Sequence, residues 1–185
     1  MRILGISGSL RRDSSNTKLL RAAEELLPAD VELVFFDQLE AVPPYNEDRD
    51  DDDPPLGAVH LRDAIAEADA VLFATPEYNG SVPGQLKNAV DWASRPHRVS
   101  ALWGKPVAVI GASSGMYGAV WAQADLRKIL GVAGTRVVDA EVAVGRADSR
   151  FDEDGRLMDD EIRDELREAL ESLIVEAAPV RLVAA

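Results

Sequence analysis

The chain has 185 residues, a hydrophobic content of 46% and no cysteine, which excludes disulfides, thiolate catalysis and cysteine-ligated metals. The net charge of −13 argues against nucleic acid or an anionic membrane as the main partner. No apolar run approaches the ~20 residues of a membrane span, so we expect a cytoplasmic protein with a single domain over residues 1–185.

Short apolar segments alternate with amphipathic segments along the chain. The apolar segments predict buried strands at 2–6, 31–36, 70–74, 106–110 and 135–138, with continuation of the fifth to Val144 left open. Apolar residues at helical spacing follow each strand and predict helices before Pro28 and over 56–68, 83–95, 119–130 and 159–177.

This alternation predicts an α/β fold in which right-handed crossovers build a parallel sheet that is covered on both faces. With five strands, a flavodoxin-like three-layer sandwich with strand order 2-1-3-4-5 is the natural candidate. In that order the loops at 7–16, 75–82 and 111–118 follow the first, third and fourth strands. They are expected at one edge of the sheet, where such folds bind ligands.

The first of these loops is rich in hydrogen-bond donors. Arg11 offers a guanidinium, the start of the next helix offers free backbone N–H groups, and hydroxyl or amide groups come from Ser9, Ser14, Ser15, Asn16 and Thr17. This set suits a phosphate monoester, although the loop lacks the Gly-Lys-Ser/Thr ending of an ATPase P-loop. A polar loop that only caps the helix remains an equal alternative.

The second loop lies within the segment TPEYNGSVPGQLKNAVDW, residues 75–92. The chain is expected to turn at Pro76 and at Asn79-Gly80, and then to begin a helix. Ser81 is placed to cap that helix, and Pro83 has the backbone angle favoured in a first turn.

The third loop contains Gly111-Ala-Ser-Ser-Gly115, a match to the G-x-S-x-G turn of serine hydrolases. In those enzymes the histidine follows the serine in the chain, whereas His60 and His97 both precede Ser113. A serine hydrolase therefore stays a minor alternative, and small residues at this loop suit the close approach of a planar ligand.

The segment EDRDDDD, residues 47–53, concentrates acidic side chains in a long connection. Adjacent carboxylates repel one another and show no ligand spacing, so we expect a solvated, mobile loop and no metal site.

Together, GSLRRDSSNTKLL, TPEYNGSVPGQLKNAVDW and GASSGMYGA, in this order and spacing, resemble the NADPH-dependent FMN reductases, a flavodoxin-like group that includes chromate and quinone reductases and azoreductases. The resemblance implies FMN as cofactor and NADPH or NADH as hydride donor. It implies that the FMN phosphate is held by Ser9, Arg11, Ser15, Asn16 and Thr17. The flavin ring and the ribityl chain would lie along Pro76, Glu77, Tyr78, Asn79 and Gly80. The other edge of the ring would be approached by Ser113, Ser114 and Gly115.

The resemblance also implies the acceptor and the assembly. A quinone-like, azo, metal-oxyanion or free-flavin acceptor would follow the nicotinamide, and a homodimer or homotetramer would place helix 83–95 near the subunit boundary. Because the flavin carries the redox chemistry, no catalytic side chain is nominated. Two other functions share this fold: a flavodoxin-type electron carrier to a protein partner, and a regulatory domain without flavin.

Overall fold

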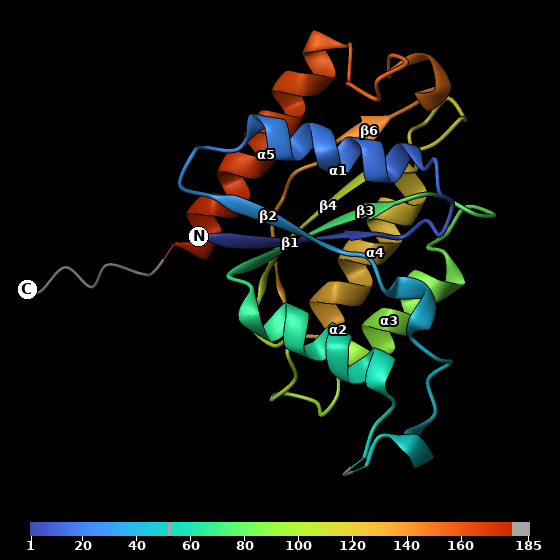
Figure 1. Ribbon diagram of the computed structural model, residues 1–185, viewed down its shortest axis with the longest axis vertical. Coiled ribbons are helices and arrows are strands. Elements are labelled where there is room, and N and C mark those ends of the chain that lie inside the picture. Colours follow the sequence, from blue (N-terminus) through green and yellow to red (C-terminus); the bar gives the residue numbers. More distant parts are fainter. Residues whose placement is uncertain (52, 179–185) are drawn as a thin grey trace, which may run out of the picture.

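The computed structural model describes residues 1–51 and 53–178, in which a parallel sheet lies between two layers of helices (Figure 1). The strands are β1 (Arg2–Ser7), β2 (Glu32–Phe36), β3 (Ala70–Thr75), β4 (Pro106–Ala112), β5 (Arg136–Val137) and β6 (Ala143–Val144). The helices are α1 (Ser15–Leu26), α2 (Leu56–Glu67), α3 (Gly84–Ala93), α4 (Val120–Val132) and α5 (Asp160–Ala177), with short 3-10 turns η1 (Leu39–Ala41), η2 (Glu47–Arg49) and η3 (Ala147–Ser149).

The strand order is β2-β1-β3-β4-β5, and every pairing is parallel, which confirms the predicted α/β flavodoxin-like order. Strand β1 pairs with β2 on one side and with β3 on the other. Because all strands run the same way, the loops that follow β1, β3 and β4 lie at one edge of the sheet, on the right in Figure 1.

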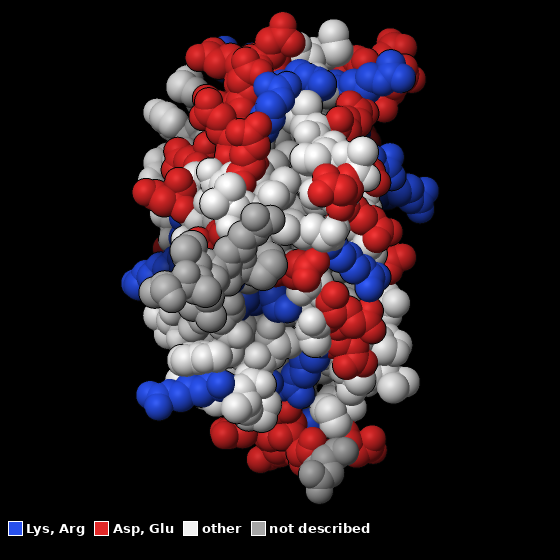
Figure 2. Space-filling view, turned by 90° about the vertical axis from the view of Figure 1, so that its left-hand side faces the viewer, with Lys and Arg blue, Asp and Glu red and all other residues white. Residues whose placement is uncertain are grey.

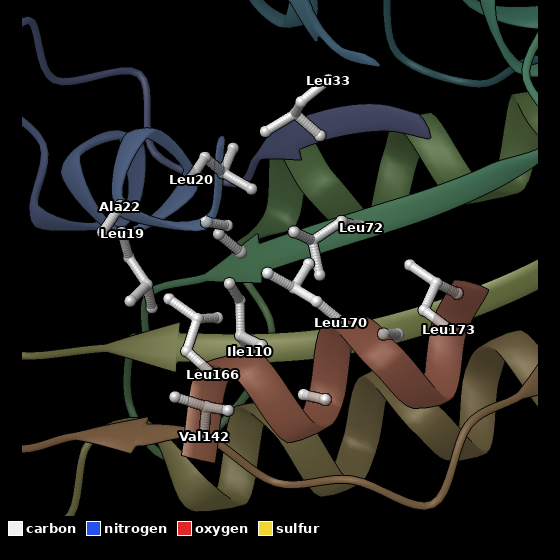
Figure 3. Close-up of a cluster of buried hydrophobic side chains, with 14 of the residues drawn as sticks. Leu19, Leu20, Ala22, Leu33, Leu72, Ile110, Val142, Leu166, Leu170 and Leu173 are labelled. Carbon is white, nitrogen blue, oxygen red and sulfur yellow. The ribbon is translucent and has the colours of Figure 1, made fainter. Parts of the chain in front are cut away.

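Two separate cores cover the two faces of the sheet. Neighbouring residues of β3 point to opposite faces, so Leu72 packs with α1 and α5, whereas Phe73 packs with α2, α3 and α4. In the first core the leucines of α1 and α5 pack together over the same face of β4. Figure 3 shows this for Leu19 of α1, Leu166 of α5 and Ile110 of β4. Burial of this apolar surface fixes the strands whose ends carry the loops.

The predicted fifth strand is confirmed at Arg136–Val137, and the continuation to Val144 that the sequence left open is interrupted. The chain pairs with β4 at Arg136–Val137, leaves it, and pairs with it again at Ala143–Val144 as β6. Between the two pairings, Arg127 of α4 donates hydrogen bonds to the carbonyl oxygens of Ala140 and, at 3.5 Å, of Val109. The guanidinium thus occupies the two carbonyl oxygens that would accept backbone hydrogen bonds if the strand paired with β4 without interruption.

The predicted cap of the third helix is also wrong. Helix α3 begins at Gly84 with Pro83 as its N-cap residue, and no side chain caps it. Ser81 instead donates its hydroxyl to Asp125 Oδ2 of α4 at 2.8 Å. Ser81 closes the turn that begins at Tyr78 and so lies two residues before the N-cap position.

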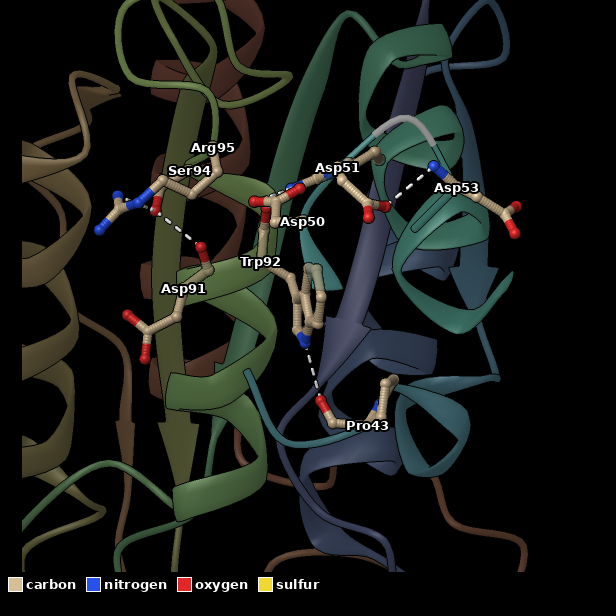
Figure 4. A network of polar contacts seen from close by, with 9 residues as sticks. Pro43, Asp50, Asp51, Asp53, Asp91, Trp92, Ser94 and Arg95 are labelled. Atoms are coloured by element: carbon tan, nitrogen blue, oxygen red, sulfur yellow. Dashed lines mark hydrogen bonds and ion pairs between the residues drawn. The ribbon is translucent and has the colours of Figure 1, made fainter. Parts of the chain in front are cut away.

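The acidic segment is less free than the sequence predicts. Asp50 accepts two hydrogen bonds, at 2.8 and 2.9 Å, from Arg62 of α2, and its side chain is only 12% exposed. Arg62 also donates to the carbonyl of Trp92, whose indole N–H donates to Pro43 at 2.7 Å (Figure 4). These contacts attach the connection between β2 and α2 to helices α2 and α3. Asp52, in the same segment, lies outside the described residues.

Acidic side chains lie at the top, along the right side and at the bottom of the face shown in Figure 2, with basic side chains scattered among them. That face carries the amino ends of the strands and is remote from the three loops. Within residues 1–51 and 53–178, no helix has the length and apolar character needed to cross a membrane.

Candidate functional site

The three loops predicted to meet do meet around one hollow at the carboxyl edge of the sheet. The hollow measures about 100 Å³ and is lined by Ser9, Arg11, Ser14, Ser15, Asn16, Pro76, Glu77, Tyr78, Ala112, Ser113, Ser114 and Asp148. The predicted residues Thr17, Asn79, Gly80 and Gly115 belong to the same loops but do not line it.

The first loop presents the positive end of α1 to this hollow. Ser14 is the N-cap residue, and its hydroxyl accepts hydrogen bonds from the N–H groups of Asn16 and Thr17. The first turn of α1 carries no acidic residue, so the partial positive charge of the helix end is not neutralised within the helix. An anion placed here would be stabilised.

Two charged groups frame this helix end. The Arg11 guanidinium is exposed and donates to the carbonyl of Asp13 at 2.9 Å, which holds it beside the loop. The hydrogen bond from Lys18, at 2.6 Å, holds the pKa of the Asp13 carboxyl below its usual value. Since Lys18 neutralises Asp13, the guanidinium remains the dominant charge on this side of the hollow.

Asn16 lines the hollow, but its side chain is committed elsewhere. Its carboxamide nitrogen donates to the carbonyl of Ala112 at 2.9 Å, and its oxygen accepts the Ala112 N–H at 3.0 Å. Asn16 is 3% exposed and Ala112 1%. The side chain therefore joins the start of α1 to the end of β4, which brings the first and third loops together.

Thr17 has a similar internal partner. Its hydroxyl donates to Ser7 Oγ at 3.1 Å, and Ser7 Oγ also accepts the N–H of Ser9 at 3.4 Å. Ser7 thus links the end of β1 to both ends of the first loop. The hydroxyls of Ser9 and Ser15 remain as the candidate ligands in this loop.

The second loop is a tight two-residue turn. Tyr78 and Ser81 exchange backbone hydrogen bonds of 3.1 and 3.2 Å around Asn79 and Gly80, whose φ angles are 55° and 74°. Positive φ at both central residues is the reason that Asn-Gly suits this turn. The turn leaves the Tyr78 ring 51% exposed at the rim of the hollow.

The third loop is held by β6 and by the segment that follows it. The Ser113 N–H donates to Val144, the Ala147 N–H donates to Ser113, and the carbonyl of Gly115 accepts from Arg146. Gly118 adopts φ 57°, and a Cβ there would lie 2.3 Å from the carbonyl carbon of Ala143. The loop therefore packs directly on β6 and the chain after it, and its small residues leave the hollow open.

A second hollow of about 330 Å³ adjoins the first. It is lined by Gly8, Leu10, Arg11, Tyr78, Pro83, Gly84 and Gln85, so Arg11 and Tyr78 form the wall between the two. Together the two hollows reach the lower end of the ~300–1,000 Å³ typical of cofactor sites. The donor set fits a phosphate at the start of α1 with a planar group along Tyr78.

The arrangement does not supply a hydrolase triad. Neither histidine lines the hollow that contains Ser113. His60 Nδ1 lies 2.9 Å from Gln38 Oε1, and the His97 ring packs edge-on against Trp103. Ser113 therefore has no histidine base among the residues that line the hollow.

The sequence did not identify two residues of this site. Asp148 lies in η3, after β6, and reaches the hollow because the third loop packs on that segment. Ser7, the last residue of β1, organises the first loop. The strand-end position of Ser7 was a usable signal, whereas Asp148 lies in no recognisable motif.

Comparison with known proteins agrees with this geometry. Residues 1–149 match the family model for NADPH-dependent FMN reductase. A NAD(P)H-dependent FMN reductase of Pseudomonas aeruginosa is 42% identical over 94% of this chain and 93% of its own length. A 2-hydroxy-1,4-benzoquinone reductase of a Burkholderia species is 40% identical over 88% of each chain.

A solved structure shows the same architecture. The flavoenzyme NAD(P)H:(acceptor) oxidoreductase of Paracoccus denitrificans superimposes with a TM-score of 0.82 at 35% identity. The match covers 95% of this chain and 96% of that one, so the two chains share the architecture over nearly their whole length.

Proposed function

The chain belongs to the NADPH-dependent FMN reductase family, and we propose that it is an NAD(P)H-dependent oxidoreductase whose FMN lies across the three loops. The observation that carries this proposal is the meeting of these loops at one hollow, with the positive end of α1 and Arg11 on one side and Tyr78 on the other. A flavin mononucleotide has the matching halves, a phosphate and a planar ring.

The phosphate side is proposed to use Ser9, Arg11 and Ser15 together with the helix end. Hydroxyl and guanidinium donors bind a phosphate without a metal ion, and the helix end adds a favourable field. Asn16 and Thr17 contribute to this side through the shape that they give the loop, since their side chains are bonded to Ala112 and Ser7 and their N–H groups to Ser14 Oγ.

The ring side is proposed to use the turn at Pro76–Gly80 and the third loop at 113–115. When bound, FMN supplies the redox chemistry, here hydride transfer from a nicotinamide nucleotide towards an acceptor. The chain's own part is to orient the ring, to exclude water from one face of it and to offer N–H donors near its polar edge.

The acceptor is proposed to be a quinone-like molecule. One relative is named for a benzoquinone substrate. Exposed aromatic rings stand on the second loop (Tyr78, which lines the hollow), on the third loop (Tyr117) and on α4 (Trp121). Tyr117 and Trp121 pack edge-to-face with their centroids 5.2 Å apart. Aromatic faces of this kind suit planar acceptors, and azo, metal-oxyanion and free-flavin acceptors are the alternatives to assay beside quinones.

A homodimer or homotetramer is proposed as well, with α3 near the subunit boundary. A groove of about 490 Å³ between α3 and α4 is lined by charged and apolar side chains, and among the apolar ones Val132 is 76% exposed. Exposed apolar surface of this kind favours association, and sedimentation of the purified protein would measure the assembly. A cytoplasmic location is part of the same proposal, because the reaction requires a supply of nicotinamide nucleotide.

The experiment is a two-step assay on the purified chain. Addition of apoprotein to FMN should quench flavin fluorescence to a saturating stoichiometry, and the loaded protein should oxidise NADPH or NADH when a benzoquinone is present. An absence of FMN binding would refute the proposal. Binding of FMN without nucleotide oxidation would favour the flavodoxin-type carrier.

A further inference from the structure

The ring-side loop is attached to a helix that lies far from it in the sequence. Helix α4 begins after Ala119, whose φ is 63°, and it has no side-chain cap of its own and no acidic residue in its first turn. The first N–H groups of a helix require acceptors from outside it. Within the described residues, two of these N–H groups have their acceptor in the second loop.

Glu77 supplies that acceptor. Its Oε2 accepts hydrogen bonds of 3.1 Å from the N–H groups of both Trp121 and Ala122, the second and third residues of α4. An N-cap serine or aspartate makes this kind of contact from within its own helix. Glu77 makes it from 44 residues away, with a negative charge at the positive end of the helix dipole.

A second tether lies one turn further along α4. Ser81 Oγ donates to Asp125 Oδ2 at 2.8 Å. The two tethers flank the tight turn at Asn79 and Gly80, whose ends are already joined by the backbone hydrogen bonds between Tyr78 and Ser81. The residues on both sides of the turn are therefore hydrogen-bonded to the same helix.

We propose that Glu77 is a positioning residue, which sets the ring-side loop against α4 through its carboxylate and does not bind the cofactor with that carboxylate. This inference rests on the proposed function, because the loop it positions is the one assigned to the flavin ring. Since the Glu77 oxygen is shared by two backbone donors, its side chain is directed to the helix, while its backbone and the Tyr78 ring are left to face the ligand.

Four variants test the proposal. Glu77→Ala removes the acceptor, and Glu77→Gln retains an acceptor oxygen of the same reach without the charge. Ser81→Ala removes only the second tether and is the smaller perturbation should Glu77→Ala fail to fold. The matched control is Glu171→Ala, which removes an exposed negative charge from α5 on the opposite face of the sheet.

The first readout uses apoprotein and needs no flavin. Amide hydrogen exchange of Trp121 and Ala122 should accelerate about tenfold or more in Glu77→Ala, because the loss of one charged hydrogen bond corresponds to about that factor. Exchange in Glu77→Gln should stay within about threefold of the wild type, and Glu171→Ala should leave it unchanged.

The second readout is the FMN dissociation constant from fluorescence quenching. We expect it to rise about tenfold in Glu77→Ala and about threefold in Ser81→Ala, with recovery towards the wild-type value in Glu77→Gln, because a displaced loop must be reordered on binding. Rescue by glutamine is the outcome that distinguishes an acceptor of backbone N–H groups from a charge needed by the ligand.

Three results would overturn the inference. Unchanged exchange in Glu77→Ala would show that the contact with α4 does not stabilise the helix start. Accelerated exchange with unchanged FMN affinity would show that the cap does not position the loop. Equal loss of affinity in Glu77→Gln and Glu77→Ala would assign the carboxylate to the ligand. A wild-type protein that binds no FMN would instead refute the proposed function and, with it, this role.

Discussion

Replacement of Asn16 by alanine should destabilise the protein before any ligand is added. The Asn16 carboxamide exchanges two hydrogen bonds with the backbone of Ala112, at 2.9 and 3.0 Å. The neighbouring N–H groups of Gly111 and Ser113 point the other way, to Val142 and Val144. The carboxamide therefore occupies the place of the next peptide of β3, which leaves the ladder after Thr75.

The magnitude follows from the groups left without partners. Asn16→Ala strands one N–H and one C=O of Ala112, a residue that is 1% exposed. Each buried backbone group without a partner costs about 1–3 kcal/mol, so the free energy of unfolding should fall by about 2–4 kcal/mol once some relaxation is allowed. That is a large share of the about 5–15 kcal/mol that holds a typical domain.

Urea unfolding of the apoprotein measures this change. With a slope of about 2–3 kcal/mol per molar urea, the midpoint should fall by about 1–2 M. Ser15→Ala is the matched control, because Ser15 is the adjacent residue of the same helical turn and is only half-buried. That control should change stability by less than about 0.5 kcal/mol and should still weaken FMN binding.

The reasoning would be refuted if Asn16→Ala changed the free energy of unfolding by no more than the Ser15→Ala control. If the variant kept its stability but lost affinity for FMN, the side chain would be a phosphate ligand, as the sequence alone predicts, and the bridge to Ala112 would be incidental.

Three further predictions concern the charged groups. Arg11→Ala should weaken FMN binding by about 1–3 kcal/mol, as expected for a lost charged hydrogen bond, and unchanged affinity in a fluorescence titration would remove Arg11 from the site. Asp50→Asn should lower stability by about 1–3 kcal/mol and speed proteolysis of the connection between β2 and α2, because it breaks the largely buried pair with Arg62; a loss of FMN affinity would contradict this, since Asp50 lines neither hollow. Partial desolvation of the side chain raises the pKa of the Glu165 carboxyl above its usual value, and the nearby carboxylate of Glu161 adds to the shift. The folded state therefore holds that proton more tightly than the unfolded state, and ionisation at higher pH costs stability. Glu165→Gln should raise the free energy of unfolding near pH 7 by a few tenths of a kcal/mol, since the site is exposed and screened, and the gain should vanish as pH falls below the usual value of 4.5. An equal gain at every pH would point to a cause other than titration.

The sequence determined the strands and helices because their signal is local. Five residues such as Ala70–Ala74 are apolar enough to read as a buried strand, and the structure extends that strand only to Thr75. The helical stripe of Leu166, Leu170 and Leu173 is buried as predicted. From alternation and topology alone, the order of the strands and the convergence of the three loops could be predicted, since parallel strands bring their carboxyl ends to one edge.

The roles of individual polar residues within those loops were decided by tertiary structure. Asn16 reads as a phosphate ligand from its place at a helix start, yet its partner, Ala112, lies 96 residues away. Ser81 reads as a cap for α3, yet it donates to Asp125. A polar side chain bonds to whichever unpaired group folding brings within about 3 Å, and no local pattern contains that information.

The same reason explains the division of the fifth strand and the place of Glu77. Between the two pairings with β4, the Arg127 side chain donates hydrogen bonds to two carbonyl oxygens. One of them belongs to β4 and the other to the chain between β5 and β6. Periodicity and strand order thus settle the sheet and the edge at which the ligand is expected. Strand ends and helix starts leave backbone groups unpaired, and polar side chains bond to them. These bonds decide which side chains hold the loops together and which remain to bind the ligand. They form only when distant segments of the chain pack together.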